Sequence, residues 1–377
     1  MIKTFGKKKI DVTAAFLELL KAGLWEKKTS FSQYVEVDYP ELMRLAKEQT
    51  VVGLVTAGLE HVTDTVLSKV ELLQFIGLTL QIEEQNKSMN RFIAYLVEKM
   101  RREDEICTFL IKGQGVAQCY ERPLWRACGD VDFLLSYENY EKAKRYLSSI
   151  ASHVETEDNR RLHLGMTIES WVVELHGTMY TEISNRINKV INDVQNCIFY
   201  GGSVRSWSND SVQVLLPSAD NSVIIVFTHF IDHFYGEGIG LRQICDWVRL
   251  LWKYKNEIDQ SLLEKRIRKM GLMTEWKAFA SLAVNYLGMP EESMPFYSNS
   301  KSYKCKAKKI CDLILETGNL GQNKDNSYRQ NSNKFKENLI TFFRRLGEFA
   351  RISTIFPLDA PRFFMRYIIN RFRAKSA

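Results

Sequence analysis

The spacing of apolar residues predicts helices over the first hundred residues of the chain. A first helix occupies about residues 11–25, with apolar side chains three and four positions apart. Pro40 stands where a first-turn proline is tolerated, and the pattern after it predicts one helix over 40–59. A long amphipathic pattern then covers 65–102. Residues 1–105 are therefore expected to form an N-terminal helical region.

From Ile106 onward the pattern changes from a helical to a strand-like period. Short apolar or alternating runs predict strands at Cys107–Ile111, Asp130–Leu135, Arg161–Met166 and Ser170–Leu175. Helical patterns separate these runs, most clearly over Tyr137–Ile150. Residues 106–216 are expected to form a core of the α+β class, with a small mixed β-sheet.

Helical periodicity returns after Pro217 and predicts a C-terminal helical region over 217–377. The predicted helices begin at Ser218 and continue over 241–254, 262–269 and 274–287. The polar stretch 319–333 contains few apolar residues and predicts a mobile loop. The α+β core is therefore flanked by a helical region on each side of it in the sequence.

The positive charge of the chain is concentrated near its C-terminus. The formal net charge is +7, but residues 301–377 contain 17 Lys and Arg against 6 Asp and Glu. The basic amphipathic stretch 356–373 suits an anionic partner or a membrane surface, or it packs back on the protein. We favour packing, because its aromatic and aliphatic residues also suit a protein core.

The composition is that of a globular protein with a substantial core, since 45% of residues are hydrophobic. No apolar run approaches the roughly 18–20 residues of a membrane-spanning helix, and no signal peptide is evident. The 7 cysteines are scattered and lack C-x-x-C spacing. This pattern predicts reduced thiols in a cytoplasmic protein and argues against a zinc site.

The clearest candidate chemistry is a pair of carboxylates, Asp130 and Asp132. Two residues apart on a strand, they share one face at a separation of roughly 6.6–6.8 Å along the chain. Neighbouring carboxylates repel each other, and a divalent cation such as Mg²⁺ (or Mn²⁺) would relieve that repulsion. Glu174 lies within a strand of Trp, Val and Leu residues, where an unpartnered acid is expensive to bury. We therefore expect all three to be catalytic carboxylates that hold the metal, with Glu174 alternatively acting as a general base.

The turn before the Asp pair is a candidate phosphate-binding site, formed by Lys112, Gly113 and Gln114. Glycine lets the backbone approach a phosphate closely, and free N–H groups at the start of the next helix favour an anion. Arg126 suits a bidentate contact to a phosphate or to a site carboxylate. His176 shares a face with Glu174 and is a candidate for the substrate side, although each histidine alone suits a hydrogen-bonded position near the core.

Five motifs in this order resemble the nucleotidyltransferase fold of the DNA polymerase β superfamily, and most closely the bacterial uncharacterised nucleotidyltransferase family. They are Lys112-Gly113, Arg126, Gly129-Asp130-Val131-Asp132, Val173-Glu174-Leu175-His176, and Thr228-His229-Phe230 with the run Leu241 to Trp247. The resemblance implies that the helices carrying His229, Arg242 and Asp246 close over the nucleotide site, on the acceptor side. Superfamily members often have Gly-Ser or Gly-Gly where this chain has Gly113-Gln114.

The resemblance implies transfer of a nucleoside monophosphate from an NTP, such as ATP, to an acceptor, with release of pyrophosphate. Related genes commonly accompany surface-polysaccharide genes, which points to a sugar or polysaccharide precursor as acceptor. One alternative is a non-catalytic nucleotide-binding or regulatory module. Another is a metal-dependent glycosyltransferase, although such enzymes need alternating strands and helices before the Asp-x-Asp, and the upstream pattern here is helical.

Overall fold

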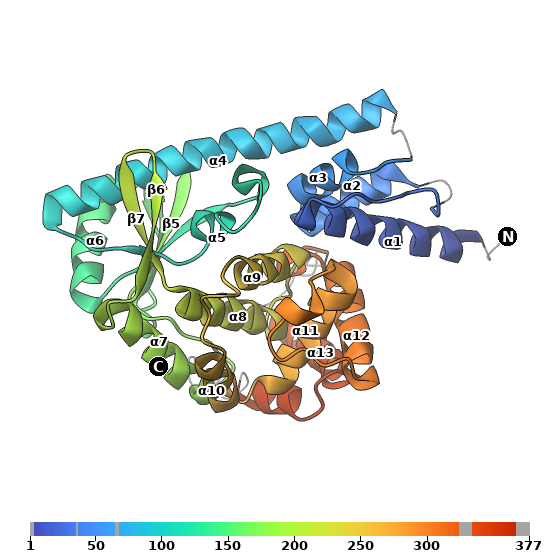
Figure 1. Cartoon of the computed structure of the whole chain (residues 1–377). Coiled ribbons are helices and arrows are strands. Elements are labelled where there is room, and N and C mark those ends of the chain that lie inside the picture. The colour runs from blue at the N-terminus through green and yellow to red at the C-terminus, as the bar shows by residue number, and fades with distance from the viewer. Residues whose placement is uncertain (1–3, 35–36, 65–67, 324–333, 367–377) are drawn as a thin grey trace.

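A seven-stranded mixed sheet lies at one end of the molecule (Figure 1). The computed structural model describes residues 4–34, 37–64, 68–323 and 334–366. In spatial order the strands are β3 (His153–Val154), β4 (His163–Ile168), β5 (Trp171–His176), β2 (Asp130–Leu134), β1 (Phe109–Leu110), β7 (Val212–Pro217) and β6 (Val204–Asn209). β2 runs parallel to β5, β1 runs parallel to β7, and the remaining neighbours are antiparallel. The expected α+β class with a mixed sheet is confirmed.

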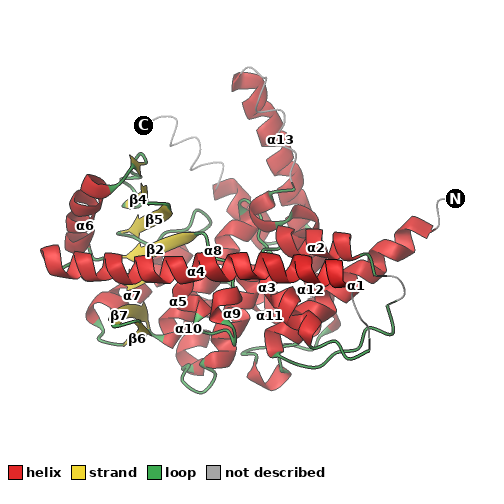
Figure 2. Ribbon diagram, turned by 90° about the horizontal axis from the view of Figure 1, so that it is seen from above, coloured by secondary structure: helices red, strands yellow, loops and turns green. Residues whose placement is uncertain are grey.

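One face of this sheet is apolar and is covered by two helices, α4 (Lys69–Asp104) and α6 (Tyr137–Ile150). The helix α4 begins with a capping box between Ser68 and Glu71, and its second half buries a stripe of residues against the sheet. Figures 1 and 2 show α4 continuing past the sheet to reach the N-terminal helices. Val131 and Phe133 of β2 contribute to the core on this covered face, so the alternating residues of β2 face the opposite side.

The three N-terminal helices are α1 (Thr4–Trp25), α2 (Tyr39–Glu48) and α3 (Val52–Glu60). The prediction of one continuous helix over 40–59 is wrong, because the chain breaks at Gln49 and Thr50. Thr50 has a positive φ of 54°, and the Gln49 side chain donates to the Ile314 carbonyl at 3.1 Å and accepts from the Leu241 N–H at 3.0 Å. These distant partners hold the break and cannot be read from the local pattern.

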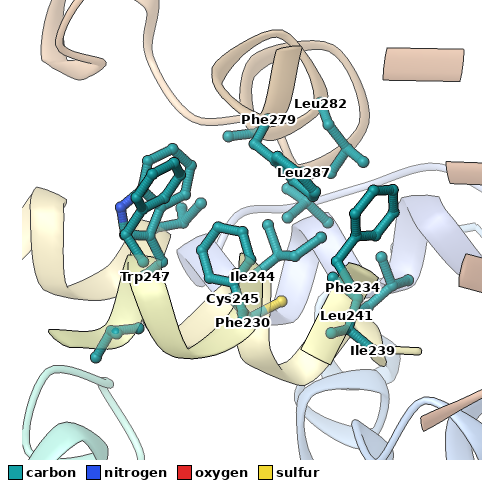
Figure 3. Packing of buried hydrophobic residues seen from close by; sticks show 14 of the residues in the cluster. Phe230, Phe234, Ile239, Leu241, Ile244, Cys245, Trp247, Phe279, Leu282 and Leu287 are labelled. Atoms are coloured by element: carbon teal, nitrogen blue, oxygen red, sulfur yellow. The ribbon is translucent and has the colours of Figure 1, made fainter. Parts of the chain in front are cut away.

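Seven helices of the C-terminal half form the largest core of the described chain, together with α1–α3. They are α7 (Asn185–Tyr200), α8 (Ala219–Tyr235), α9 (Leu241–Lys253), α10 (Gln260–Met270), α11 (Met273–Leu287), α12 (Lys301–Thr317) and α13 (Lys334–Ser353). Figure 3 shows Phe230 of α8, Trp247 of α9 and Phe279 of α11 converging in this core. The Phe230 and Phe279 ring centroids are 5.0 Å apart, and Phe230 and Trp247 5.6 Å. The division of the chain into three regions at residues 105 and 216 stays a prediction. In the structure, the N-terminal helices α1–α3 share one hydrophobic core with the C-terminal helices.

The basic C-terminal stretch packs on the protein as far as it is described. Phe356 and Phe363 are buried, and the Phe363 ring lies 4.7 Å from the ring of Tyr235 on α8. The preferred prediction of packing is therefore confirmed up to Arg366, and the rest of the stretch lies outside the described residues. No helix in the described part of the chain is long and apolar enough to cross a membrane.

The stretch predicted as a mobile loop is only partly described. Asn319–Gly321 forms a short 3₁₀ helix, and residues 324–333 lie outside the described residues. The helix α7 and the hairpin of β6 and β7 were not predicted from the sequence pattern. The other short elements are α5 (Gln114–Ala117) and 3₁₀ turns at Pro123–Trp125 and Glu291–Ser293.

Candidate active site

Three carboxylates of the sheet line one cavity of about 250 Å³. Asp130 and Asp132 come from β2, and Glu174 comes from β5, where Asp132 and Glu174 are register partners. The expected alternation is confirmed, since Val173 and Leu175 are fully buried on the covered face while Glu174 is half-buried on the other. The parallel pairing of β2 and β5 therefore brings the third carboxylate beside the Asp pair.

The glycine turn before α5 places Lys112 against these carboxylates. Gly113 has φ 57°, and a Cβ there would lie 3.0 Å from the Cys128 sulfur and 3.3 Å from the Asp130 carbonyl oxygen. The turn therefore requires a glycine on both conformational and steric grounds. It directs Lys112 into the cavity, where its Nζ lies 2.6 Å from Asp132 Oδ1.

Two histidines hold the carboxylates from the side of β4 and β5. His176 Nε2 lies 2.9 Å from Asp132 Oδ1 and 3.4 Å from Glu174 Oε2. His163 Nε2 lies 3.3 Å from the same Glu174 oxygen. His163 and His176 are register partners in the antiparallel pair β4 and β5, with ring centroids 4.8 Å apart.

The three carboxylates differ in how readily they ionise. Hydrogen bonds from His163 and His176 hold the pKa of Glu174 far below its usual range. Burial would raise the pKa of Asp132, but Lys112 and the hydrogen bond from His176 outweigh it, so that pKa is lowered. The pKa of Asp130 is raised, first by the negative charge of Asp132 and then by burial. Asp130 is therefore the carboxylate whose charge the protein itself compensates least.

The opposite wall of the cavity is formed by α8, α9 and nearby turns. It carries basic and polar side chains from distant parts of the chain: Arg126, His229, His233, Arg242, Gln243 and Asp246, with Leu320 at the edge. Burial, and after it the positive charge of Lys112, holds the pKa of His229 well below its usual value. Arg242 is fixed by donating from Nε to Thr50 Oγ1 at 3.0 Å. The cavity thus has one wall with three carboxylates and an opposite wall on which the two arginines outnumber the one carboxylate, Asp246.

Arg126 and Asp246 form a buried bidentate ion pair across this wall. Arg126 Nε lies 3.0 Å from Asp246 Oδ1 and Arg126 Nη2 lies 2.6 Å from Asp246 Oδ2. The Tyr120 hydroxyl donates to Asp246 Oδ1 at 2.7 Å. The bidentate contact expected of Arg126 is therefore made to a carboxylate on α9 rather than to Asp130 or Asp132, and a contact of Arg126 to phosphate stays a prediction.

Gln114 differs from the other predicted phosphate-binding residues. Its side chain is 1% exposed, faces α4 and donates to Asn86 Oδ1 at 2.6 Å. It is not among the residues that line the cavity, and a phosphate contact by Gln114 stays a prediction, for which its backbone N–H is the better placed donor. The short helix α5 turns the side chain away from the cavity that Lys112 and Gly113 line.

Several residues that the fold brings to this site were not predicted from the sequence. Tyr120 completes the Arg126–Asp246 pair, and His163 reaches Glu174 only through the register of β4 against β5. His233 lies one helical turn after His229, and their ring centroids are 4.5 Å apart. Residues at i and i+4 lie on the same face of a helix, so this spacing in the sequence could have identified His233 as a neighbour of His229.

The donor set fits a hard divalent cation. Among the described residues, no hydrogen bond or ion pair is found for the Asp130 carboxylate, although Asp132 raises its pKa. Mg²⁺ prefers oxygen ligands and usually binds one or two carboxylates together with substrate phosphates. Asp130, Asp132 and Glu174 would hold such an ion, and Lys112 and Arg242 line the same cavity, where phosphates would lie.

Comparison with known proteins agrees with this geometry. Searches against curated proteins and against solved structures gave no match. The family model described as uncharacterised nucleotidyltransferase matches residues 35–288, which include the whole sheet and every charged residue of the cavity. The chain therefore belongs to the uncharacterised nucleotidyltransferase family.

Proposed function

We propose that this protein is a Mg²⁺-dependent (or Mn²⁺-dependent) nucleotidyltransferase. It would move a nucleoside monophosphate from an NTP to an acceptor hydroxyl or phosphate and release pyrophosphate. The observation that carries this proposal is the cavity itself, in which three carboxylates of adjacent strands face a wall that carries Arg126 and Arg242. Membership of a nucleotidyltransferase family supports the same chemistry.

The residues of the cavity would have two roles, to hold a metal ion and to orient the nucleotide. A bound divalent ion would neutralise phosphate charge and lower the pKa of an acceptor oxygen. Lys112 and Arg242 line the cavity and would attract and orient the triphosphate, because both are cations beside the space it would fill. The new bond joins the acceptor oxygen to the α-phosphorus, and the bond from that phosphorus to pyrophosphate breaks.

The hydrogen bonds to Glu174 favour a role as ligand over a role as general base. A general base works best when its pKa lies near the operating pH. The two histidines hold the pKa of Glu174 far below that range, so the carboxylate stays ionised and accepts protons poorly. Glu174 is therefore assigned to metal binding together with Asp130 and Asp132.

The acceptor is proposed on the family resemblance alone, as a sugar or a surface-polysaccharide precursor. The cavity has the polar character that a phosphorylated substrate requires, but its lining is equally compatible with other hydroxyl-bearing acceptors. The acceptor is therefore best found by testing classes of acceptor once nucleotide use is established.

The test is incubation of the purified protein with Mg²⁺ and each α-labelled NTP, with and without a panel of sugar phosphates and glycan precursors. Pyrophosphate release and label transfer are expected from the wild type and from Asp312→Asn, a matched change at an exposed carboxylate on α12. Both signals should vanish in the Asp130→Asn, Asp132→Asn double variant. Nucleotide binding with no pyrophosphate release across the panel would favour a non-catalytic module, and hydrolysis of UDP-sugars instead would favour a glycosyltransferase.

A further inference from the structure

We infer that His163, Glu174 and His176 form a second metal site, which takes a zinc-class ion rather than Mg²⁺. The ligand atoms of these three residues lie within 4.8 Å of one another. Both imidazoles present Nε2 to the same oxygen of Glu174. The inference rests on the proposed function only in that Glu174 belongs to both sets of ligands.

The two distances from the histidines to Glu174 match the spacing of ligands around a small tetrahedral ion. Two ligands that each lie about 2.0–2.1 Å from a tetrahedral ion are roughly 3.3–3.4 Å apart. Glu174 Oε2 lies 3.3 Å from His163 Nε2 and 3.4 Å from His176 Nε2. The ligand atoms of the two histidines lie within 4.8 Å of each other, and they would have to reach a similar separation for all three residues to bind one ion.

The strands make this arrangement rigid and leave it reachable. His163 and His176 are paired across β4 and β5, and Glu174 lies two residues before His176 on the same face. The side chain of His163 is 32% exposed and that of Glu174 is 29% exposed, so an ion has access from solvent. A site on paired strands keeps its ligands in place better than a site on loops.

A further carboxylate lies on the same face at the edge of the site. Gly165 is the register partner of Glu174, and a Cβ at Gly165 would lie 2.5 Å from Glu155 Oε2. The carboxylate of Glu155 therefore occupies the space beside Gly165 on this face of the sheet. The nearby cation Lys112 is paired with Asp132, which limits its repulsion of an entering ion.

The donor types decide which metal binds. Neutral imidazole suits Zn²⁺, Co²⁺ and Ni²⁺, whereas Mg²⁺ prefers an all-oxygen set such as Asp130, Asp132 and Glu174. The scattered cysteines argued against a zinc site in the sequence. The structure assigns the zinc-class site to histidines that only the β4–β5 register brings together.

The test is direct metal binding by the full chain, without nucleotide. Zn²⁺ affinity is measured by competition with a chromophoric chelator in excess Mg²⁺, and Co²⁺ binding is followed by its visible absorption. We expect one ion per chain, with the spectrum of a four-coordinate site and no thiolate charge-transfer band. His163→Asn and His176→Asn should each lower the Zn²⁺ affinity by at least about 10–100-fold. Loss of a residue that only hydrogen-bonds to a metal ligand already lowers metal affinity by that factor, and loss of a ligand itself should cost no less.

The matched control is His61→Asn. His61 Nε2 lies 2.7 Å from Glu26 Oε2, so it forms a histidine–carboxylate pair of similar exposure, with no second imidazole beside it among the described residues. Unchanged affinity in His61→Asn is expected. Equal Zn²⁺ affinity in wild type and His163→Asn, or a thiolate band with Co²⁺, would overturn the inference. These readouts need no NTP, so the metal site and the transferase activity can fail separately.

Discussion

Asp132 and Glu174 face each other across the parallel strands β2 and β5, although a helix and two further strands separate them in sequence. His176 hydrogen-bonds to Asp132 at 2.9 Å and approaches Glu174 at 3.4 Å, so the two carboxylates are held by a common neighbour. Asp130, on the same face, has no such partner among the described residues. This difference leads to the first prediction.

Asp130→Asn is expected to abolish activity while stabilising the protein without metal. The raised pKa of Asp130 shows that its charge is unfavourable in the folded state, because Asp132 repels it. Removing that charge should increase the free energy of unfolding at pH 7 by roughly 0.5–2 kcal/mol, the usual gain from removing an unfavourable charge. Nucleotidyl transfer should fall at least about 100-fold. Thermal unfolding in EDTA, beside Asp312→Asn, measures the first effect; a lower melting temperature for Asp130→Asn would contradict it.

The Arg126–Asp246 pair is expected to be essential for stability. Asp246→Asn leaves the Arg126 guanidinium buried without its counter-charge, and breaking a buried pair in this way costs about 3–5 kcal/mol. Tyr120→Phe removes one hydrogen bond to a charged group and should cost about 1.5–3 kcal/mol. Urea denaturation measures both.

The control for this pair is the exposed ion pair of Arg268 and Glu264 on α10. Glu264→Gln should change the free energy of unfolding by less than about 1 kcal/mol, because water screens exposed pairs. If Asp246→Asn and Glu264→Gln lowered the free energy of unfolding equally, the buried Arg126–Asp246 pair would matter no more for stability than an exposed pair.

Glu275 is expected to make stability fall as pH rises. Burial, and after it the charge of Asp359, raises the pKa of Glu275 to about 8, and its Oε1 accepts the Tyr235 hydroxyl at 2.9 Å. Between its unfolded pKa of about 4.3 and about 8, the unfolded chain is ionised at this position while the folded chain keeps the proton. The unfolded state therefore binds fewer protons, and the free energy of unfolding decreases with pH across this window.

The measurement compares wild type with Glu275→Gln in urea at pH 5, 7 and 9. The variant cannot ionise there, so the wild type should lose stability relative to it between pH 5 and pH 9. The difference between the two proteins should be on the order of a few kcal/mol and should level off above pH 8. Parallel stability curves for the two proteins would refute this role of Glu275.

Lys112→Ala is expected to weaken nucleotide binding about 10–100-fold, the loss expected for one charge-assisted contact. Lys112 Nζ lines the cavity and lies 2.6 Å from Asp132 Oδ1, so it stands between the carboxylates and the space proposed for the phosphates. Fluorescent nucleotide titration measures the dissociation constant. Lys142→Ala, on the far helix α6, is the matched control, and equal affinities in the two variants would remove Lys112 from the phosphate site.

The local sequence was enough to predict the helix Tyr137–Ile150, the strand of Asp130 and Asp132, and the alternation around Glu174. In each case the information lies within a few neighbouring residues, because helix and strand periods put apolar side chains on one face. Lys112 and Gly113 could be predicted for the same reason, since a tight turn requires glycine. These local signals also identified the three carboxylates that line the cavity.

Only the tertiary structure determined the partners of these residues. The break at Gln49, the Arg126–Asp246 pair and the meeting of His163 with Glu174 all join segments distant in sequence. A strand's own pattern fixes which side chains share a face, but the neighbouring strand and its register depend on burial across the whole sheet. The sequence by itself therefore identified the candidate carboxylates Asp130, Asp132 and Glu174, which line one cavity in the structure. The tertiary structure determined which charged groups lie beside each of these residues, because the strength of an ionic interaction depends on the distance between the groups and on their burial.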